Sequence, residues 1–169
     1  MAAPLNIKKT GDWNAVSGML NGLQREIEIA AQQTTMQIGL HAEGLARKHM
    51  TNQDLGWQEL KARTITVKSK RGGSDLILVD TSSYFQAITS WFDKAKGVAY
   101  VGIKKTVKNE DGEEIADIAK VHEYGSVVRN VPARPLWQPT ENEMQQVVAK
   151  SKLFKVNLNK RLAKYGINV

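Results

Sequence analysis

Residues 121–140, VHEYGSVVRNVPARPLWQPT, contain the changes of direction that connect the middle of the chain to its C-terminal part. Gly125 follows the helical pattern IADIAKVHEY and predicts that a short helix ends there. Two prolines favour extended backbone for the residues that precede them, so VVRNVPARPLW is expected to be extended. Thr140 and Glu143 have the spacing of a capping box, which predicts that the last helix begins at about residue 140.

On the N-terminal side, residues from about 14 to 49 are expected to form one long helix. Apolar and small side chains recur there at steps of three and four, which places them on one stripe. The stripe consists of Leu20, Leu23, Ile27, Ala30, Thr34, Ile38, Ala42, Leu45 and His49. A helix of about 35 residues is roughly 50 Å long, which is more than a compact domain of this size covers. Part of the stripe is therefore expected to contact something outside the subunit.

The region between, about residues 55–138, is expected to hold a small antiparallel sheet. ITSWFDKA and VAYVGI lie on either side of a turn at Lys96 and Gly97, and the second alternates with the period of a strand. Asp80 or Thr81 is expected to cap a short helix, SSYFQAI, before this hairpin. Asp111-Gly112 predicts a protruding polar turn after it.

The C-terminal helix is expected to span about residues 140–165. Its apolar stripe consists of Met144, Val147, Val148, Phe154, Leu158, Leu162 and Tyr165. No linker or internal repeat interrupts the chain, so residues 1–169 are interpreted as a single α+β domain. Its expected architecture is a small antiparallel sheet packed by the long N-terminal helix, a short middle helix and the C-terminal helix.

The net charge is +7, and the basic residues suggest an acidic partner or DNA. The segment VKSKRGGSD lacks the phosphate-loop pattern and is expected to be an exposed loop, with DNA contact as the alternative. The tail after residue 150 is basic, whereas residues 111–150 are acidic, which would favour head-to-tail attraction between subunits or simply provide two solvated faces. The candidate contacts are Lys68, Lys70, Arg71, Lys152, Lys155, Lys160, Arg161 and Lys164.

Composition argues against several classes of function. The chain contains no cysteine, which excludes disulfides, thiolate nucleophiles and cysteine-based zinc sites. The sequence contains no run of about 18 apolar residues, so no membrane span is expected. The N-terminal stretch MAAPLNIKKTGDW lacks the apolar segment of a signal peptide, so export is not expected. The lack of cysteine also fits a protein made and used in a reducing cytoplasm.

The His122-Glu123 pair is the strongest candidate for chemistry, but its surroundings do not support it. A zinc protease pattern needs a second histidine four residues later, where this chain has Ser126. His41 and His49 are about 12 Å apart along a helix, too far to share a metal ion. No nucleophile elbow or nucleic-acid reading motif occurs. We therefore expect no catalytic residues, no metal, no cofactor and no small-molecule substrate.

The same stretch resembles a known family. Bacteriophage tail-completion or head–tail joining proteins, also described as neck or virion morphogenesis proteins, tend to read His-Glu-[Phe/Tyr]-Gly, a variable spacer, and Pro-Ala-Arg-Pro with an apolar residue. The matching residues are His122, Glu123, Tyr124, Gly125, Pro132, Ala133, Arg134, Pro135 and Leu136. Weaker similarities upstream are carried by Trp57, Leu60, Thr64, Leu78, Thr81 and Ile88. Ser82 and Phe85 depart from the family's usual glycine and leucine.

The resemblance implies a structural virion protein with no enzymatic activity. Copies would form a six- or twelvefold ring at the neck, join the portal or connector to tail proteins, and let genomic DNA pass. The protein would assemble in the host cytoplasm. A tail terminator or other tail protein is the nearest alternative, and a non-specific DNA-binding accessory protein is the alternative of another class.

Two residues of the motif have open structural roles. Two prolines brace Arg134, which would let it grip a carboxylate in the same or a neighbouring subunit, with Glu123 as the candidate partner within the chain. Alternatively, Arg134 only holds its own loop. Trp137 is either an interface anchor or a core residue.

Overall fold

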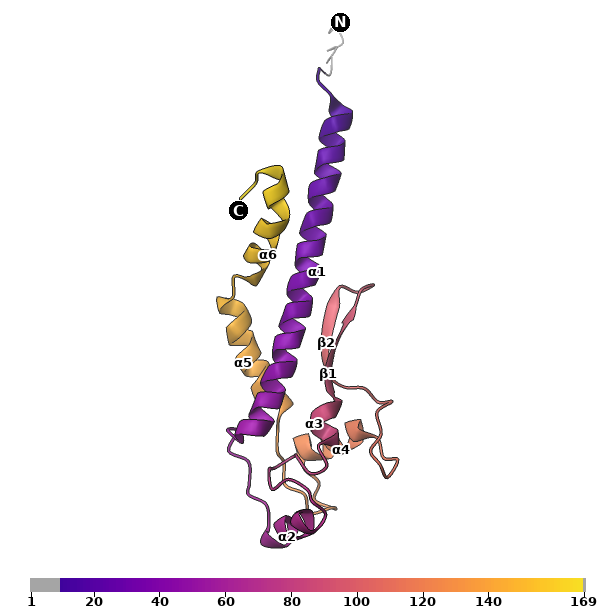
Figure 1. Ribbon diagram of the computed structural model, residues 1–169, viewed down its shortest axis with the longest axis vertical. Coiled ribbons are helices and arrows are strands. Elements are labelled where there is room, and N and C mark those ends of the chain that lie inside the picture. Colours follow the sequence, from indigo (N-terminus) through magenta and orange to yellow (C-terminus); the bar gives the residue numbers. More distant parts are fainter. Residues whose placement is uncertain (1–9, 169) are drawn as a thin grey trace, which may run out of the picture.

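The structure of the protein is a computed structural model that describes residues 10–168. It confirms the α+β class: a two-stranded antiparallel sheet is combined with six α-helices and one 3₁₀ turn. Figure 1 shows the elongated molecule, with one helix running along most of its height. The elements are α1 (Trp13–Asn52), α2 (Ala62–Lys70), α3 (Ser83–Ala87), β1 (Ile88–Asp93), β2 (Val98–Ile103), α4 (Ile115–Tyr124), α5 (Trp137–Lys150), α6 (Leu153–Leu162) and η1 (Ala163–Tyr165).

The long helix α1 forms as expected and has 40 residues, which corresponds to a length of roughly 60 Å. The Asp12 side chain accepts a hydrogen bond from the Ala15 backbone N–H at 3.0 Å and caps its start. Gln53 ends it with a left-handed φ of 56°. The β-hairpin lies against the C-terminal half of α1, and α5 and α6 lie along another side of the helix (Figure 1).

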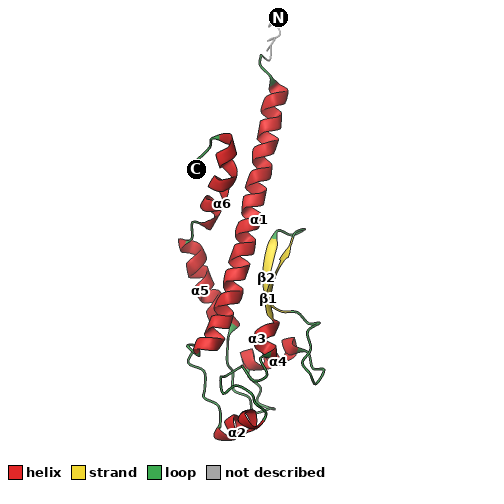
Figure 2. Cartoon of the chain, viewed as in Figure 1, coloured by secondary structure: helices red, strands yellow, loops and turns green. Residues whose placement is uncertain are grey.

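The hairpin is confirmed, with Ile88 opposite Ile103 and Asp93 opposite Val98. Figure 2 shows it lying alongside the middle of α1. Gly39 permits this contact, because a Cβ atom at that position would lie 3.1 Å from the Cβ of Ala99. The hairpin supplies the sheet that the sequence predicted, and α1 serves as its backing.

The C-terminal helix is not continuous, so the prediction of one helix over about 140–165 is wrong. It is divided into α5 and α6 at Ser151, whose backbone is extended and whose hydroxyl accepts a hydrogen bond from the Leu153 N–H at 3.1 Å. Serine side chains compete in this way with helical hydrogen bonds. The break lets α6 lie along α1, where Asn157 donates to the Thr34 hydroxyl at 3.0 Å.

The predicted capping box of Thr140 and Glu143 is also wrong. Helix α5 begins at Trp137, so Thr140 already lies inside it and its hydroxyl donates to the Leu136 carbonyl at 2.7 Å. Glu143 extends instead toward buried His49, with 3.5 Å between its Oε2 and the ring Nε2.

Two further local predictions need correction. Ser82, not Asp80 or Thr81, stands at the N-cap of α3, with a left-handed φ of 65° and no side-chain capping bond. A glycine would adopt that conformation without strain, whereas a serine adopts it at a backbone cost. Part of VKSKRGGSD is the last turn of α2 and not an exposed loop.

The core has two parts. The larger one surrounds Met50, Ile88 and Leu136, where the C-terminal end of α1 meets α3, α4 and the start of α5. The smaller one lies between α1 and α6, around Ala30, Leu158 and Leu162. Of the predicted α1 stripe, Leu20 and Ile27 are exposed. None of the helices within residues 10–168 combines the length and the apolarity that a membrane crossing requires.

Candidate functional site

The candidate site is the corner between α4 and α5, which we define as residues 122–138. Gly125 ends α4 with a φ of 75°, and the chain returns so closely that a Cβ atom there would lie 2.9 Å from the Ala133 backbone nitrogen. The Arg134 N–H donates to the His122 carbonyl at 2.6 Å. The two halves of the sequence motif, His122–Gly125 and Pro132–Leu136, are therefore one structural unit.

Glu123 holds the start of α5. Its carboxylate accepts hydrogen bonds from the backbone N–H groups of Leu136 at 2.7 Å, Trp137 at 3.1 Å and Gln138 at 3.2 Å. The first N–H groups of a helix have no partner within the helix and carry its positive dipole end. Glu123 is thus a capping group supplied from 13 residues upstream.

Arg134 does not pair with Glu123, contrary to the prediction. It is buried, and its Nε and Nη2 atoms donate to the Gln58 carbonyl at 3.3 and 3.1 Å. Burial lowers the pKa of Arg134, but a guanidinium remains protonated at neutral pH. Nor do its side-chain contacts stay within its own loop, as the alternative interpretation expected: the side chain ties the corner to the segment around Gln58.

A second contact reinforces this tie. The Trp57 indole Nε1 donates to the Pro135 carbonyl at 2.8 Å, and its ring is buried in the larger core. Trp137 is partly buried and packs against the same core, which includes Tyr84. Burial, with the nearby Glu123 charge, raises the pKa of Tyr84, so its hydroxyl stays neutral. Trp137 therefore belongs to the core and not to an exposed anchor.

The titratable groups of the corner serve packing. Burial, together with the charge of Arg134, lowers the pKa of His122 and favours its neutral form. Its Nδ1 atom is buried and, within residues 10–168, meets no hydrogen-bond partner. Over the same residues no three histidine or carboxylate side chains come together as a metal-binding group.

The spacer between the two halves of the motif forms a projecting tip, defined here as residues 126–131. Ser126 and Val131 exchange two backbone hydrogen bonds, of 2.8 and 2.9 Å, at its base. Residues 127–130 form a turn there, so the prediction of continuous extended backbone from Val127 is wrong at these positions. Val127 and Val128 are 99% and 98% exposed, and neighbouring Tyr124 is 78% exposed. The rigid corner thus presents apolar side chains directly to solvent.

An open cleft lies beside the tip, between α2, the corner and residues 109–111. It has a volume of about 1120 Å³ and is lined by side chains of both charges, including Arg63, Asp80 and Arg129. Its size and mixed charge suit a segment of another protein better than a small compound.

The predicted basic contacts fall into two groups. Lys68 is buried and donates to the Leu76 and Val79 carbonyls, both at 2.7 Å, and burial lowers its pKa. It is therefore a structural residue, which contradicts its prediction as a surface contact. Lys70, Lys152, Lys155 and Lys160 are exposed, whereas Arg71 pairs with Asp80 at 3.2 Å.

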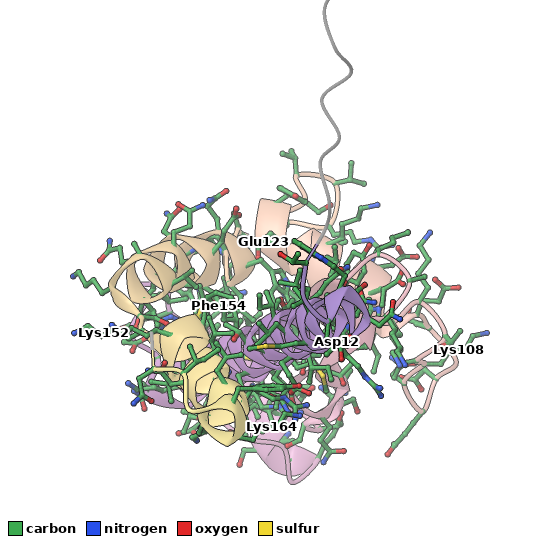
Figure 3. The ribbon with its side chains drawn as sticks, turned by 90° about the horizontal axis from the view of Figure 1, so that it is seen from above. Asp12, Lys108, Glu123, Lys152, Phe154 and Lys164 are labelled. Atoms are coloured by element: carbon green, nitrogen blue, oxygen red, sulfur yellow. The ribbon has the colours of Figure 1, made fainter. Side chains whose placement is uncertain are left out.

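Two residues of the basic tail are engaged within the chain. Lys164 bonds Glu26 of α1 at 2.6 Å, and Arg161 lies 3.5 Å from the same carboxylate. The Lys164 hydrogen bond lowers the pKa of Glu26 and raises that of Lys164. In Figure 3, which looks down from the N-terminal end of α1, Lys164 lies near α1, whereas Lys152 points outward. The tail thus keeps an outward set of lysines and uses the rest to dock α6.

Sequence reasoning missed the partners of the corner. Gln58 binds Arg134 through its backbone carbonyl, which every residue type has, so the sequence gives no sign of this contact. Trp57 was named without any indication of this partner, and its bond to Pro135 spans 78 residues. Lys68, four residues before Gly72, gave no local sign in the sequence that its side chain would be buried.

No protein-family model, curated protein or solved structure matches this chain.

Proposed function

We propose that this chain is a structural protein of a bacteriophage neck, acting in head–tail joining or tail completion. Copies would assemble as a ring, six- or twelvefold, between the capsid portal or connector and the tail, and genomic DNA would pass through its centre. It would carry out no catalysis. Its place of action would be the virion, after assembly in the host cytoplasm.

The corner is the observation that carries this proposal. The residues that resemble the family signature form one unit. Within it, the side chains of Arg134 and Glu123 form hydrogen bonds to backbone groups of the same chain. What the unit offers to solvent is the tip, with Val127 and Val128 almost completely exposed. A soluble monomer gains nothing from two adjacent exposed valines on a rigid turn, whereas a contact surface does.

Mechanically, such a joint works by burial of many weak contacts. One tip buries too little apolar surface for stable binding, since a specific interface removes about 800 Å² per partner. A ring presents the tip many times on one face, and the contacts then add by avidity. A tail terminator would use the same arrangement.

Imaging and composition of particles test the proposal. Purified protein is examined by negative-stain microscopy alone and with isolated capsids or tails of the phage that encodes it. We expect rings, and density at the neck of joined particles. A Val127→Asp/Val128→Asp variant should fold normally but no longer attach. Joined, infectious particles that lack the protein would refute the proposal.

A DNA-binding accessory role has one observation in its favour, the outward lysines Lys152, Lys155 and Lys160. It predicts that the isolated chain binds duplex DNA with an affinity that falls steeply with salt. Substituting these three lysines by glutamine would then abolish binding, whereas the neck role predicts that particles still join.

A further inference from the structure

We propose that the N-terminal half of α1 pairs with the same segment of a second copy of this chain. The contact surface is an apolar seam, defined as Trp13, Val16, Leu20 and Ile27. These side chains are 56%, 48%, 61% and 45% exposed, respectively. The inference specifies one contact within the proposed ring, but it stands on the exposed seam and not on the virion assignment.

The spacing of the seam is that of a helix-pairing surface. From Trp13 the steps to Val16, Leu20, Leu23 and Ile27 alternate between three and four residues. This is the a and d pattern of a heptad repeat, in which the side chains of one helix fit between those of an equal helix. Leu23 lies at the border of the seam and is partly buried against the end of α6.

Within residues 10–168, the first part of the seam, from Trp13 to Leu20, is left uncovered. All residues from 11 to 21 are exposed. The C-terminal part reaches only to Gly22, where a Cβ atom would lie 3.0 Å from the Tyr165 hydroxyl. Figure 1 shows α1 continuing past the end of that part. A solvated helical end of about ten residues that includes Gly18 is marginal by itself, so packing against another helix would stabilise it.

The charge pattern favours a second copy over other partners. Residues 13–34 contain three charged side chains, Arg25, Glu26 and Glu28, and Glu26 is already paired with Lys164. The positions that flank the seam are otherwise uncharged, so two copies would meet without like-charge repulsion. A membrane-surface helix or a DNA contact would carry many lysines or arginines on this segment, which it does not.

The area is adequate for a contact within an assembly. Large apolar side chains expose on the order of 150–250 Å² when free, so four half-exposed ones leave roughly 400 Å² on one helix face. Two copies would bury about twice that from the seam alone. This approaches the lower range of specific interfaces, about 1,200 Å², before the flanking polar residues are added.

The decisive comparison uses two leucines of α1 with equal exposure. Leu20 and Leu40 are both 61% exposed, but at about 100° per residue they point roughly 160° apart on the helix. Sedimentation velocity of the purified protein over a range of concentrations should show association. Leu20→Glu should raise the dissociation constant at least about 100-fold, and Leu40→Glu should leave it unchanged. Ile27→Glu provides an independent second variant on the seam.

Four results would overturn the inference, and the fourth also separates it from the neck proposal. One is a wild-type protein that remains monomeric at about 100 μM. Another is equal loss of association in Leu20→Glu and Leu40→Glu. The third is wild-type binding to vesicles of mixed neutral and anionic phospholipid that Leu20→Glu abolishes, which would make a membrane the occupant. Circular dichroism shows that each variant is folded. The fourth is ring formation by the Leu20→Glu protein, which would refute helix pairing but leave the neck proposal intact. Absence of the wild-type protein from virions would instead refute the neck proposal and leave helix pairing intact.

Discussion

Glu123 gives the most direct test of how the corner is built, and the relevant change is Glu123→Ala. The substitution removes a carboxylate that accepts three backbone N–H groups at the start of α5. The first of these belongs to Leu136, which is fully buried. Water therefore cannot replace the lost acceptor there without opening the core.

The size of the effect follows from these contacts. A hydrogen bond to a charged group contributes about 1.5–3 kcal/mol, and a negative charge at a helix N-terminus adds about 0.3–1 kcal/mol. The three bonds share one carboxylate and are not additive, so we expect a total loss of roughly 3–4 kcal/mol. For a chain of this length that corresponds to a fall in Tm of about 8–14 °C.

Urea unfolding followed by far-ultraviolet circular dichroism measures the free energy of unfolding directly. It is repeated at two protein concentrations, because self-association would raise the apparent stability. Glu123→Gln keeps one acceptor oxygen and should lose about half as much. Glu141→Ala, on the exposed face of the same helix, should change the free energy of unfolding by less than about 0.5 kcal/mol. A Glu123→Ala protein within about 1 kcal/mol of the Glu141→Ala protein would refute the capping role.

Three further predictions concern the same corner. Gly125→Ala should destabilise the protein by about 2–4 kcal/mol in urea unfolding, because its φ is 75° and the new Cβ would meet the Ala133 nitrogen. Arg134→Met should cost about 2–3 kcal/mol in the same assay, since it removes the hydrogen bonds of a charged donor to the Gln58 carbonyl. His122, whose pKa is lowered from 6.5 by burial, takes up a proton more readily in the unfolded chain. Stability should therefore be complete above about pH 6.5 and fall below it, and His122→Gln should flatten that part of the pH profile.

Each of these has a matched control. Gly112 has a similar φ of 81°, but nothing lies within 4 Å of the new Cβ. Gly112→Ala should therefore lower the free energy of unfolding by only about 1–2 kcal/mol, through backbone strain. Arg129→Met, on the exposed tip, should be close to neutral. For His122 the comparison is the exposed His41, where the same substitution should change the free energy of unfolding by less than about 0.5 kcal/mol. If His122→Gln leaves the pH profile unchanged, the loss of stability in acid comes from another group and the prediction fails.

Local signals in the sequence were sufficient for part of the fold. The periodicity of α1, the turn at Gly97 and the stop of α4 at Gly125 each depend on a few neighbouring residues, and each is confirmed. The break at Ser151 had a local signal as well, the interval from Val148 to Phe154 in the proposed apolar stripe. It was overlooked because the stripe resumes afterwards.

The contacts that build the corner were beyond local reasoning because their partners are distant in sequence. Glu123 caps a helix that begins 14 residues later, and Arg134 reaches a backbone carbonyl 76 residues away. Lys68 is buried only because a turn 8–11 residues later aims two carbonyls at its amine. Residue type gives the capacity for such bonds, but the fold decides which carbonyl or N–H group is within reach.

The two exposed apolar surfaces have a consequence when they are considered together. The tip lies beside the cleft next to α2, and Figure 1 places α2 at the opposite end of the molecule from the start of α1. A subunit that pairs with a copy through the α1 seam would therefore leave its tip available for a different neighbour. Because the tip is held by backbone bonds at its base and by Glu123 and Arg134 behind it, little ordering cost remains for that second contact. Many tips, arranged by subunit pairing, would then bind a neighbouring protein that one tip alone binds too weakly.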